Sequence, residues 1–295
     1  MQDPIIDRKR GCFYGLAIGD ALGAAVEFRH PGEFAPVTGY RGFGPHGLDA
    51  GQWTDDTSMA LALADSIAEK GWNIRDQLDR YLNWFRNGEY SVNGICFDIG
   101  GTTRNALYDF ESNGTIIADS DLSNSGNGSI MRLAPVPIKY HDHPDLQKYL
   151  SESSKTTHAS VQCVDACIAL GNILSALIHG DSKEESLCIK TNLNNDYCTL
   201  ISNIIKNRSY ISEQNIVGSG WVVKSLEAAL WAFYHSSSFE ECVLKAVNLG
   251  NDSDTTGAIA GQLAGALYGF NGIPQHLIDG LDKKDVIEKY LEPIL

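Results

Sequence analysis

The stretch LGNDSDTTGAIAGQLAGALYG, residues 249–269, joins a cluster of acids and hydroxyls to a long run of small apolar residues. Asp252, Asp254, Thr255 and Thr256 open the stretch, and small residues then recur at every third or fourth position. Acidic and hydroxyl side chains are favoured at helix starts, because they accept hydrogen bonds from free backbone N–H groups and complement the helix dipole. The stretch therefore predicts a helix that lies deep among other helices, with the acidic cluster at its start.

The rest of the chain is dominated by the same helical period. Apolar residues recur at the spacing of one helix face, and stop signals such as Lys70-Gly71 end the segments. Helices are expected at residues 8–28, 56–71, 74–88, 161–180, 220–236, 238–250 and 255–270. β-Branched residues nowhere alternate with polar ones for long, so strands are not indicated. We therefore expect an all-α fold, a compact helical bundle that forms one domain over residues 1–295.

Three segments lack this period and are rich in Gly, Asn, Asp or Pro: residues 29–52, 89–102 and 112–129. Loops of that length in a compact domain are usually functional or disordered. Glycine is also more frequent than average, at 29 of 295 residues. This frequency indicates tight loops and close helix contacts, because no low-complexity tract accompanies it.

The composition limits the partners and the compartment of the protein. The net charge is −14 and no basic block offsets it, which argues against nucleic acid and membrane surfaces as partners. The N-terminal residues lack the apolar core of a signal peptide, and no apolar run is expected to span a bilayer. Seven cysteines, an odd number without disulfide-module spacing, indicate a reducing compartment. We therefore expect a cytoplasmic protein, and a monomer.

A second acidic cluster lies near the other end of the chain, in GQWTDDTSMALALADSIAEKG, residues 51–71. There Thr54, Asp55, Asp56 and Thr57 again open an apolar run. Mg²⁺ and Mn²⁺ prefer carboxylate, hydroxyl and carbonyl oxygens. If the two helix starts face one another, their side chains could hold two divalent ions. Each cluster alone is more often a helix cap, so spacing by itself favours the metal site and a pair of caps equally.

Two further carboxylates are candidates for chemistry. Glu27 stands at the end of the apolar segment GDALGAAVEF, with Asp20 two helical turns earlier on a similar face. It is either a solvated residue at a helix end, the commoner case, or a carboxylate with a shifted pKa in an apolar setting. Asp98 precedes Gly100-Gly101 and a Thr-Thr-Arg helix start. Such a Gly-Gly turn lets a ligand approach backbone N–H groups, although a plain turn is commoner.

A glycine-rich segment offers a candidate anion site. Residues 125–129, Ser-Gly-Asn-Gly-Ser, expose consecutive N–H groups that could cradle a diphosphate, although an ordinary Asn-Gly turn is the commoner interpretation. His158 begins a later helix, and such a histidine is more often a cap or surface residue. Zinc bound by it with Cys163 and Cys167 is conceivable, but that spacing on an apolar helix more often reflects packing. Trp221 follows Gly-Ser-Gly, and most such tryptophans are core anchors, while a minority stack on a flat ring.

Taken in order, these motifs resemble the ADP-ribosylglycohydrolases. The resemblance rests on GLAIGDALGAAVEF, GQWTDDTSMALALADSI, DIGGTTRNAL, GNGSIMRLAPV, THAS and AVNLGNDSDTTGAIAGQLAGALYG, which together extend from about residue 11 to residue 269. It implies an all-α orthogonal bundle with a binuclear Mg²⁺ or Mn²⁺ centre. It also implies hydrolysis of the glycosidic bond between C1″ of ADP-ribose and an acceptor, with bacterial ADP-ribosyl-[dinitrogen reductase] hydrolases as the nearest group.

The resemblance assigns roles to the candidate residues. Glu27 and Asp98 become the catalytic carboxylates, one of which takes a proton from the attacking water while the ions lower the pKa of that water. The implied metal ligands are Thr54, Asp55, Asp56, Asp252, Asp254 and Thr255. The implied substrate-binding residues are Gly100, Gly101, Ser125, Gly126, Asn127, Gly128, Ser129, Met131, His158 and Trp221.

One departure from the family pattern leaves the acceptor open. Gly101 stands where close relatives often carry Asn, which removes a possible hydrogen bond to the ribose or the leaving group. ADP-ribosyl-arginine on a protein is the first expectation, with ADP-ribosyl-serine and O-acetyl-ADP-ribose as alternatives. Two other classes compete with a glycohydrolase: a metal-dependent nucleoside-diphosphate phosphohydrolase, and a non-catalytic ADP-ribose-binding protein.

Overall fold

The computed structural model describes residues 3–188, 196–207 and 215–295, and these residues confirm the all-α fold. No strand forms within those three ranges; two isolated β-bridges, Phe43 with Leu48 and Gly126 with Trp221, are the only extended pairings there. The α-helices are α1 (Pro4–Gly23), α2 (Asp55–Lys70), α3 (Ile74–Asn87), α4 (Gly101–Asn113), α5 (Pro135–Tyr140), α6 (Leu146–Lys155), α7 (Val161–His179), α8 (Lys183–Ser186), α9 (Asp196–Asn207), α10 (Val222–Tyr234), α11 (Phe239–Val247), α12 (Ser253–Tyr268), α13 (Gln275–Gly280) and α14 (Lys284–Leu291). Short 3₁₀ turns are η1 (Leu122–Asn124), η3 (Phe270–Gly272) and η4 (Glu292–Ile294).

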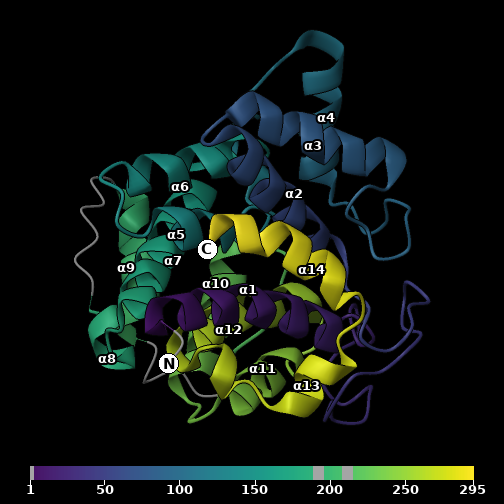
Figure 1. Cartoon of the computed structure of the whole chain (residues 1–295), viewed down its shortest axis with the longest axis vertical. Helices are drawn as coiled ribbons and strands as arrows, with labels where there is room; N and C mark the ends of the chain where they lie inside the picture. The colour runs from purple at the N-terminus through teal and green to yellow at the C-terminus, as the bar shows by residue number, and fades with distance from the viewer. Residues whose placement is uncertain (1–2, 189–195, 208–214) are drawn as a thin grey trace.

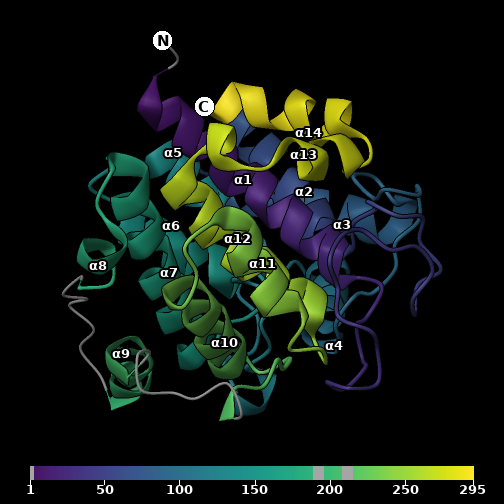
Figure 2. The same ribbon diagram turned by 90° about the horizontal axis from the view of Figure 1, so that it is seen from below.

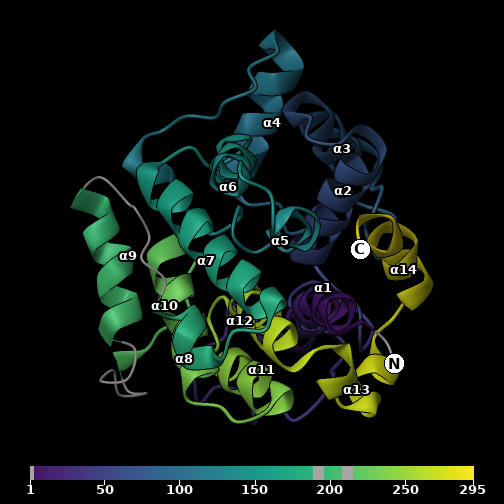
Figure 3. The same ribbon diagram turned by 60° about the vertical axis from the view of Figure 1, so that its left-hand side comes forward.

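Helices α1 and α12 form an antiparallel pair at the centre of the bundle (Figure 3). Glycines at every fourth position of α1 face glycines of α12, so that the two backbones touch. A Cβ atom on Gly19 would lie 2.0 Å from Gly257 O, and one on Gly15 would lie 2.1 Å from Gly261 O. Any side chain at these positions would push the two helices apart, which explains the small-residue period read from the sequence.

The other helices surround this pair (Figures 1 and 2). Helices α10 and α11 pack on α12, α2 packs on α3 and α14, and α6 packs on α7. Most of the core between them is apolar, with Trp53, Trp84 and Phe233 among its largest buried side chains, although polar groups such as Arg132 and Gln262 are also fully buried. Burial of this surface is the main term that stabilises the bundle.

The packing of α1 against α12 also brings three helix ends together: the end of α1 and the starts of α2 and α12. A Cβ atom on Gly23, the last residue of α1, would lie 2.4 Å from Asp254 N in the first turn of α12. Thr54, the N-cap of α2, donates its backbone N–H to Asp20 on α1 over 2.9 Å. The end of α1 and the starts of α2 and α12 therefore meet at one place, and each start carries one acidic cluster.

The structure corrects several sequence expectations. The first helix ends at Gly23 instead of reaching Phe28, because the chain turns there and Val26 N donates to Gly23 O. Glu27 therefore lies in a turn and not on a helix. Periodicity also missed helices α5, α6, α8, α9, α13 and α14, and the segment 112–129 contains η1.

Helix α7 corrects the expectation that no apolar run could span a bilayer. Its 19 residues, Val161–His179, are long and apolar enough by length and composition, and it is the single such helix in the described part of the chain. In this structure 67% of its most apolar window is buried among the other helices. Helix α7 is therefore a core helix of the bundle.

Candidate active site and metal centre

Asp20 connects α1 to the start of α2. Its Oδ1 accepts from the backbone N–H and hydroxyl of Thr54, each over 2.9 Å, and its Oδ2 accepts from Thr57 N over 3.0 Å and Thr57 Oγ1 over 2.6 Å. Burial raises the pKa of Asp20 to about 6, although these four hydrogen bonds act in the opposite direction. The sequence placed Asp20 on the face of Glu27 but assigned it no role.

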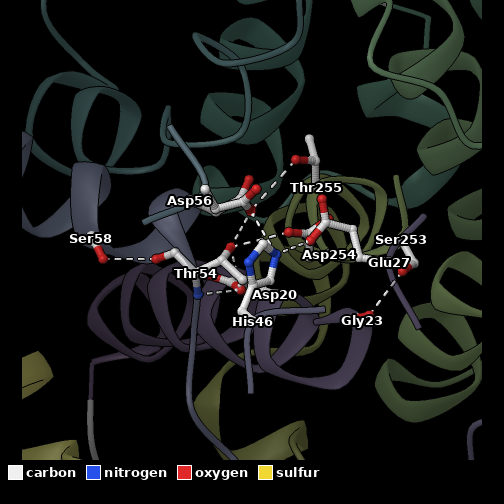
Figure 4. A network of polar contacts seen from close by, with 11 residues as sticks. Asp20, Gly23, Glu27, His46, Thr54, Asp56, Ser58, Ser253, Asp254 and Thr255 are labelled. Carbon is white, nitrogen blue, oxygen red and sulfur yellow. Dashed lines mark hydrogen bonds and ion pairs between the residues drawn. The ribbon is translucent and has the colours of Figure 1, made fainter. Parts of the chain in front are cut away.

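The two acidic clusters converge on this carboxylate (Figure 4). Thr54 Oγ1 lies 3.1 Å from Asp56 Oδ2 and 3.2 Å from Asp254 Oδ2. Thr255 Oγ1 lies 3.5 Å from Asp56 Oδ2. Oxygens of Asp20, Asp56 and Asp254 lie within 4.8 Å of one another, and oxygens of Glu27, Asp252 and Asp254 do the same. Clusters that are 200 positions apart in sequence are therefore in direct contact.

No Lys or Arg in the described ranges forms an ion pair with these acids, and most of them are buried. Seven carboxyl groups with raised pKa values gather here: Asp20, Glu27, Asp55, Asp56, Asp98, Asp252 and Asp254. Burial is the main cause for the pKa shifts of Asp55, Asp56 and Asp254, and repulsion between neighbouring carboxylates adds to it. Asp56 Oδ1 and Asp254 Oδ1 are buried with no hydrogen-bond partner among the described residues.

This arrangement fits divalent metal ions. An isolated buried carboxylate is costly, and buried charges in proteins are paired or bind metals. Hard cations such as Mg²⁺ require oxygen ligands, and all the donor atoms here are oxygens, some of them without a hydrogen-bond partner. The Asp254 carboxylate belongs to both groups of three carboxylates described above. The structure thus contains buried acidic clusters able to bind metal.

Glu27 and Asp98 lie beside this centre and meet at His46. Glu27 Oε2 lies 2.5 Å from His46 Nε2, and Asp98 Oδ2 lies 3.4 Å from the same nitrogen. Burial, then repulsion by Asp98, raises the pKa of Glu27 to about 10, and burial with repulsion by Asp252 raises the pKa of Asp98 to about 7. Burial lowers the pKa of His46. His46 belongs to the irregular segment 29–52, where no pattern marked it.

A cleft of about 810 Å³ opens over the carboxylates. Glycines 126 and 128 form part of its wall against the buried ring of His158; a Cβ atom on Gly128 would lie 2.7 Å from His158 Cε1. Burial lowers the pKa of His158 to about 3, so the ring is neutral, and its Nδ1 lies 2.8 Å from Thr157 Oγ1. Of the residues proposed for substrate, these line the cleft: Gly100, Gly101, Gly126, Asn127, Gly128, Met131 and His158.

Three of the proposed substrate residues do not line the cleft. Ser125 Oγ lies 2.8 Å from Ser160 Oγ, and Ser129 Oγ accepts from Ser154 Oγ over 3.0 Å, so both serines face the interior. Trp221 is 40% exposed outside the cleft, and its Nε1 donates to Gln162 Oε1 over 2.7 Å.

The conceivable zinc group does not form among the described residues. Cys163 Sγ lies 3.1 Å from Gly126 O, and Cys167 Sγ lies 3.4 Å from Ser129 Oγ. Neither thiol belongs with His158 to any cluster of metal-ligand atoms in those ranges. The two cysteines pack and hydrogen-bond within the core.

Asn127 connects the glycine-rich wall to the metal centre. Its Nδ2 lies 2.8 Å from Asp252 Oδ2 and 2.8 Å from Ser225 Oγ. A ligand group at residues 126–128 would therefore be held at a fixed distance from Asp252. The arrangement offers backbone donors for an anion next to carboxylates able to bind cations, with Glu27 and Asp98 beside them.

The whole chain, residues 1–295, matches the sequence model described as ADP-ribosylglycohydrolase. The chain belongs to the ADP-ribosylglycohydrolase family. It is 40% identical to "ADP-ribosylarginine hydrolase Tri1" of Pseudomonas putida (strain GB-1), over 98% of this chain and 78% of that protein. It is 34% identical to "ADP-ribosyl-[dinitrogen reductase] glycohydrolase" of Rhodospirillum rubrum, over 94% of this chain and 91% of that protein.

A solved structure agrees with this assignment. The "ADP-ribosylglycohydrolase-related protein complex" is 38% identical, with a TM-score of 0.87, and the alignment covers 98% of this chain and 97% of the other. The family assignment confirms the expected enzyme class: this ADP-ribosylglycohydrolase is a hydrolase of ADP-ribosyl glycosidic bonds.

Proposed function

We propose that this ADP-ribosylglycohydrolase cleaves the bond between C1″ of ADP-ribose and an arginine side chain of a modified protein. The convergence of buried, uncompensated carboxylates at the floor of the cleft carries the proposal. The choice of arginine is supported by two relatives, 40% and 37% identical, whose names state ADP-ribosylarginine hydrolysis.

The metal centre would hold two divalent cations, Mg²⁺ or Mn²⁺. Asp254 would contribute to both positions, with Thr54, Asp55, Asp56, Asp252 and Thr255 completing the ligand set and Asp20 fixing Thr54. Bound cations of this kind orient substrate oxygens and lower the pKa of water, so that a nucleophile exists at neutral pH. They would also neutralise part of the −14 charge where an anionic substrate must enter.

The glycine-rich wall is suited to the diphosphate. The backbone N–H groups of Gly126 and Gly128, which both line the cleft, have no acceptor in the described part of the chain, while Asn127 N–H donates to Gly220 O over 3.1 Å. Two free N–H groups near each other, with no side chain on Gly128 to block access, can donate to phosphate oxygens without a lysine. Neutral His158 behind the glycines keeps this wall in place.

Asp98 and Glu27 then lie where the glycosidic bond would be cleaved. One of these two carboxylates would remove the proton from the attacking water, since both line the cleft and Glu27 lies beside Asp252 and Asp254. His46 holds Glu27 through the 2.5 Å contact, so that the Glu27 carboxyl faces the acids and not the solvent.

The experiment that tests this function is identification of the product. The protein with Mn²⁺ or Mg²⁺ is incubated with arginine-linked, serine-linked and O-acetyl-ADP-ribose, and the products are separated. Intact ADP-ribose, released fastest from the arginine conjugate, is expected. AMP would instead indicate a phosphohydrolase, and tight binding of ADP-ribose with no turnover of any conjugate would indicate a binding protein.

A further inference from the structure

A second cavity, of about 560 Å³, lies beside the cleft and shares only Glu27 and Phe28 with it. Its walls are residues 25–29, in the turn after α1, and residues 41–45 of the purple loop at the right of Figure 1. We call it the side cavity. No step of the hydrolysis described above uses its outer part.

Two exposed phenylalanines line the side cavity. Phe28 is 66% exposed and Phe43 is 82% exposed, and their φ angles are 62° and 72°. Bulky L-residues rarely adopt this left-handed conformation, and large apolar side chains gain nothing by facing water. Backbone hydrogen bonds to Asn251 and Leu48 fix the two conformations, and Phe28 also meets the ring of His46 edge to face. Both phenylalanine rings nevertheless remain largely in solvent, which is typical of protein-binding surfaces.

Two arginines make the same surface positive. Arg41 donates from its guanidinium to the carbonyls of Ala35, over 2.7 Å, and Pro36, so its position is fixed by backbone. Neither Arg29 nor Arg41 forms an ion pair with any residue that the structure describes. In a chain of net charge −14, this surface is complementary to acidic side chains.

The surface is held rigidly against the metal centre. Phe28 N donates to Asn251 O and Asn251 N donates to Arg29 O, both over 2.6 Å, and Asn251 immediately precedes Asp252. On the other wall, Leu48 N donates to Phe43 O over 3.1 Å and closes the loop that carries His46. A segment bound here would be held at a defined distance from Glu27 and Asp98.

We propose that the side cavity binds the polypeptide of the substrate, namely the residues that flank the ADP-ribosylated arginine. This proposal rests on the proposed function. Glu27, which we place beside the bond to be cleaved, lines both the cleft and the side cavity, so an acceptor attached there would lie next to the side cavity. The surface fits a segment with an apolar residue, for contact with Phe28 and Phe43, and with Asp or Glu, for Arg29 and Arg41.

The test compares three substrates. One is ADP-ribosyl-arginine as the free amino acid; the others are peptides of equal length in which the modified arginine is flanked by Leu and Glu, or by Ser and Lys. The variants are Phe43→Gly, which suits the left-handed backbone, and Arg29→Glu. Ile117→Ala is the control, because Ile117 is also exposed but lines neither cavity.

We expect the wild type to hydrolyse the Leu/Glu peptide with a kcat/KM about tenfold above that for the Ser/Lys peptide. A difference of about this size is typical when one anchoring side chain is removed from a protein interface. Both variants should lose this preference while keeping the kcat/KM for free ADP-ribosyl-arginine, and Ile117→Ala should keep both. Equal rates for the two peptides in the wild type, or an unchanged preference in both variants, would overturn the docking proposal. Failure of the wild type to hydrolyse even the free amino-acid conjugate would instead contradict the proposed function.

Discussion

At the scale of single residues, the site depends on carboxylates that face one another with no Lys or Arg partner among the residues that the structure describes. Asp254 is central, because it belongs to both groups of converging oxygens and its Oδ1 is buried without a partner. Thr54 lies between Asp20 and Asp56, with its hydroxyl oxygen 2.9 Å from Asp20 Oδ1 and 3.1 Å from Asp56 Oδ2. The ability of each carboxylate to bind a metal ion therefore depends on the side chains that contact it.

Asp254→Asn should nearly abolish metal binding and activity. The substitution removes one negative charge and one ligand oxygen from the shared position, so kcat/KM should fall by more than the roughly 100-fold loss typical of outer-shell changes. Mn²⁺ affinity by calorimetry and ADP-ribose release measure the two effects. Asp79→Asn, on the exposed face of α3, should change neither. If Asp254→Asn keeps the wild-type affinity for Mn²⁺, Asp254 is not a metal ligand.

Gly128→Ala should raise KM while leaving kcat closer to its wild-type value. The added Cβ would lie 2.7 Å from His158 Cε1 and 3.2 Å from Thr103 Oγ1, so the wall proposed to bind the diphosphate must shift. We expect KM to rise about tenfold. Gly101→Ala is the matched control, since a Cβ there meets no atom within 4 Å although the residue lines the same cleft. Equal KM values for the two variants would argue against a diphosphate at residue 128.

The sequence predicted part of this site. The two acidic clusters are visible as repeated Asp-Thr patterns, and the helical period placed each at a helix start. Asp20 could not be assigned, because its four donors come from residues 54 and 57 on another helix. His46 gave no signal either, since its contact with Glu27 arises from the path of an irregular loop.

At the scale of elements, the glycine contact between α1 and α12 determines where the acids lie. The pairing of Gly19 with Gly257 and of Gly15 with Gly261 fixes the register of the two helices. A shift of this register would move Asp20 away from the start of α12. The stretch 249–269 thus supplies ligands at one end and the packing that positions them along its length.

Gly19→Ala should destabilise the protein and weaken metal binding together. The Cβ would lie 2.0 Å from Gly257 O, which is backbone and cannot rotate away. We expect the free energy of unfolding to fall by about 1–3 kcal/mol, as for other overpacked cores. Denaturant unfolding and Mn²⁺ titration provide the measurements. Gly39→Ala, where a Cβ meets nothing within 4 Å, is the control; equal stability of the two variants would contradict the proposed role of the contact.

Helices with a strong apolar period were predictable, and short ones were not. Residues 74–87 and 161–179 carry long periodic patterns with clear stop signals and formed as expected. Helix α13 has six residues and α5 begins at Pro135, so neither contains enough turns for periodicity to show. The end of α1 was placed too late because apolar residues continue through the turn to Phe28.

At the scale of the whole molecule, the acidic centre couples stability to pH and metal. Folding raises the pKa of Asp20 to about 6 and that of Asp98 to about 7, above an unfolded value of about 4. Between the two values the folded state binds more protons than the unfolded state, so the metal-free protein loses stability as pH rises. Bound cations favour the ionised carboxylates and reverse this trend.

Thermal unfolding in chelator should therefore give a lower Tm at pH 7.5 than at pH 5. Saturating Mn²⁺ should raise Tm more at pH 7.5 than at pH 5, because more of the ligands are ionised there. Circular dichroism at the two pH values measures all four conditions. If the Tm of the metal-free protein rises with pH across this range, folding does not raise the pKa values of these carboxyl groups.

The measurement that tests the central claim most directly is ADP-ribose release from ADP-ribosyl-arginine as Mn²⁺ is returned to chelator-treated protein. We expect no release without metal and a rate that rises until two equivalents of Mn²⁺ are bound. Release at the full rate in chelator, by protein shown to contain no metal, would contradict it.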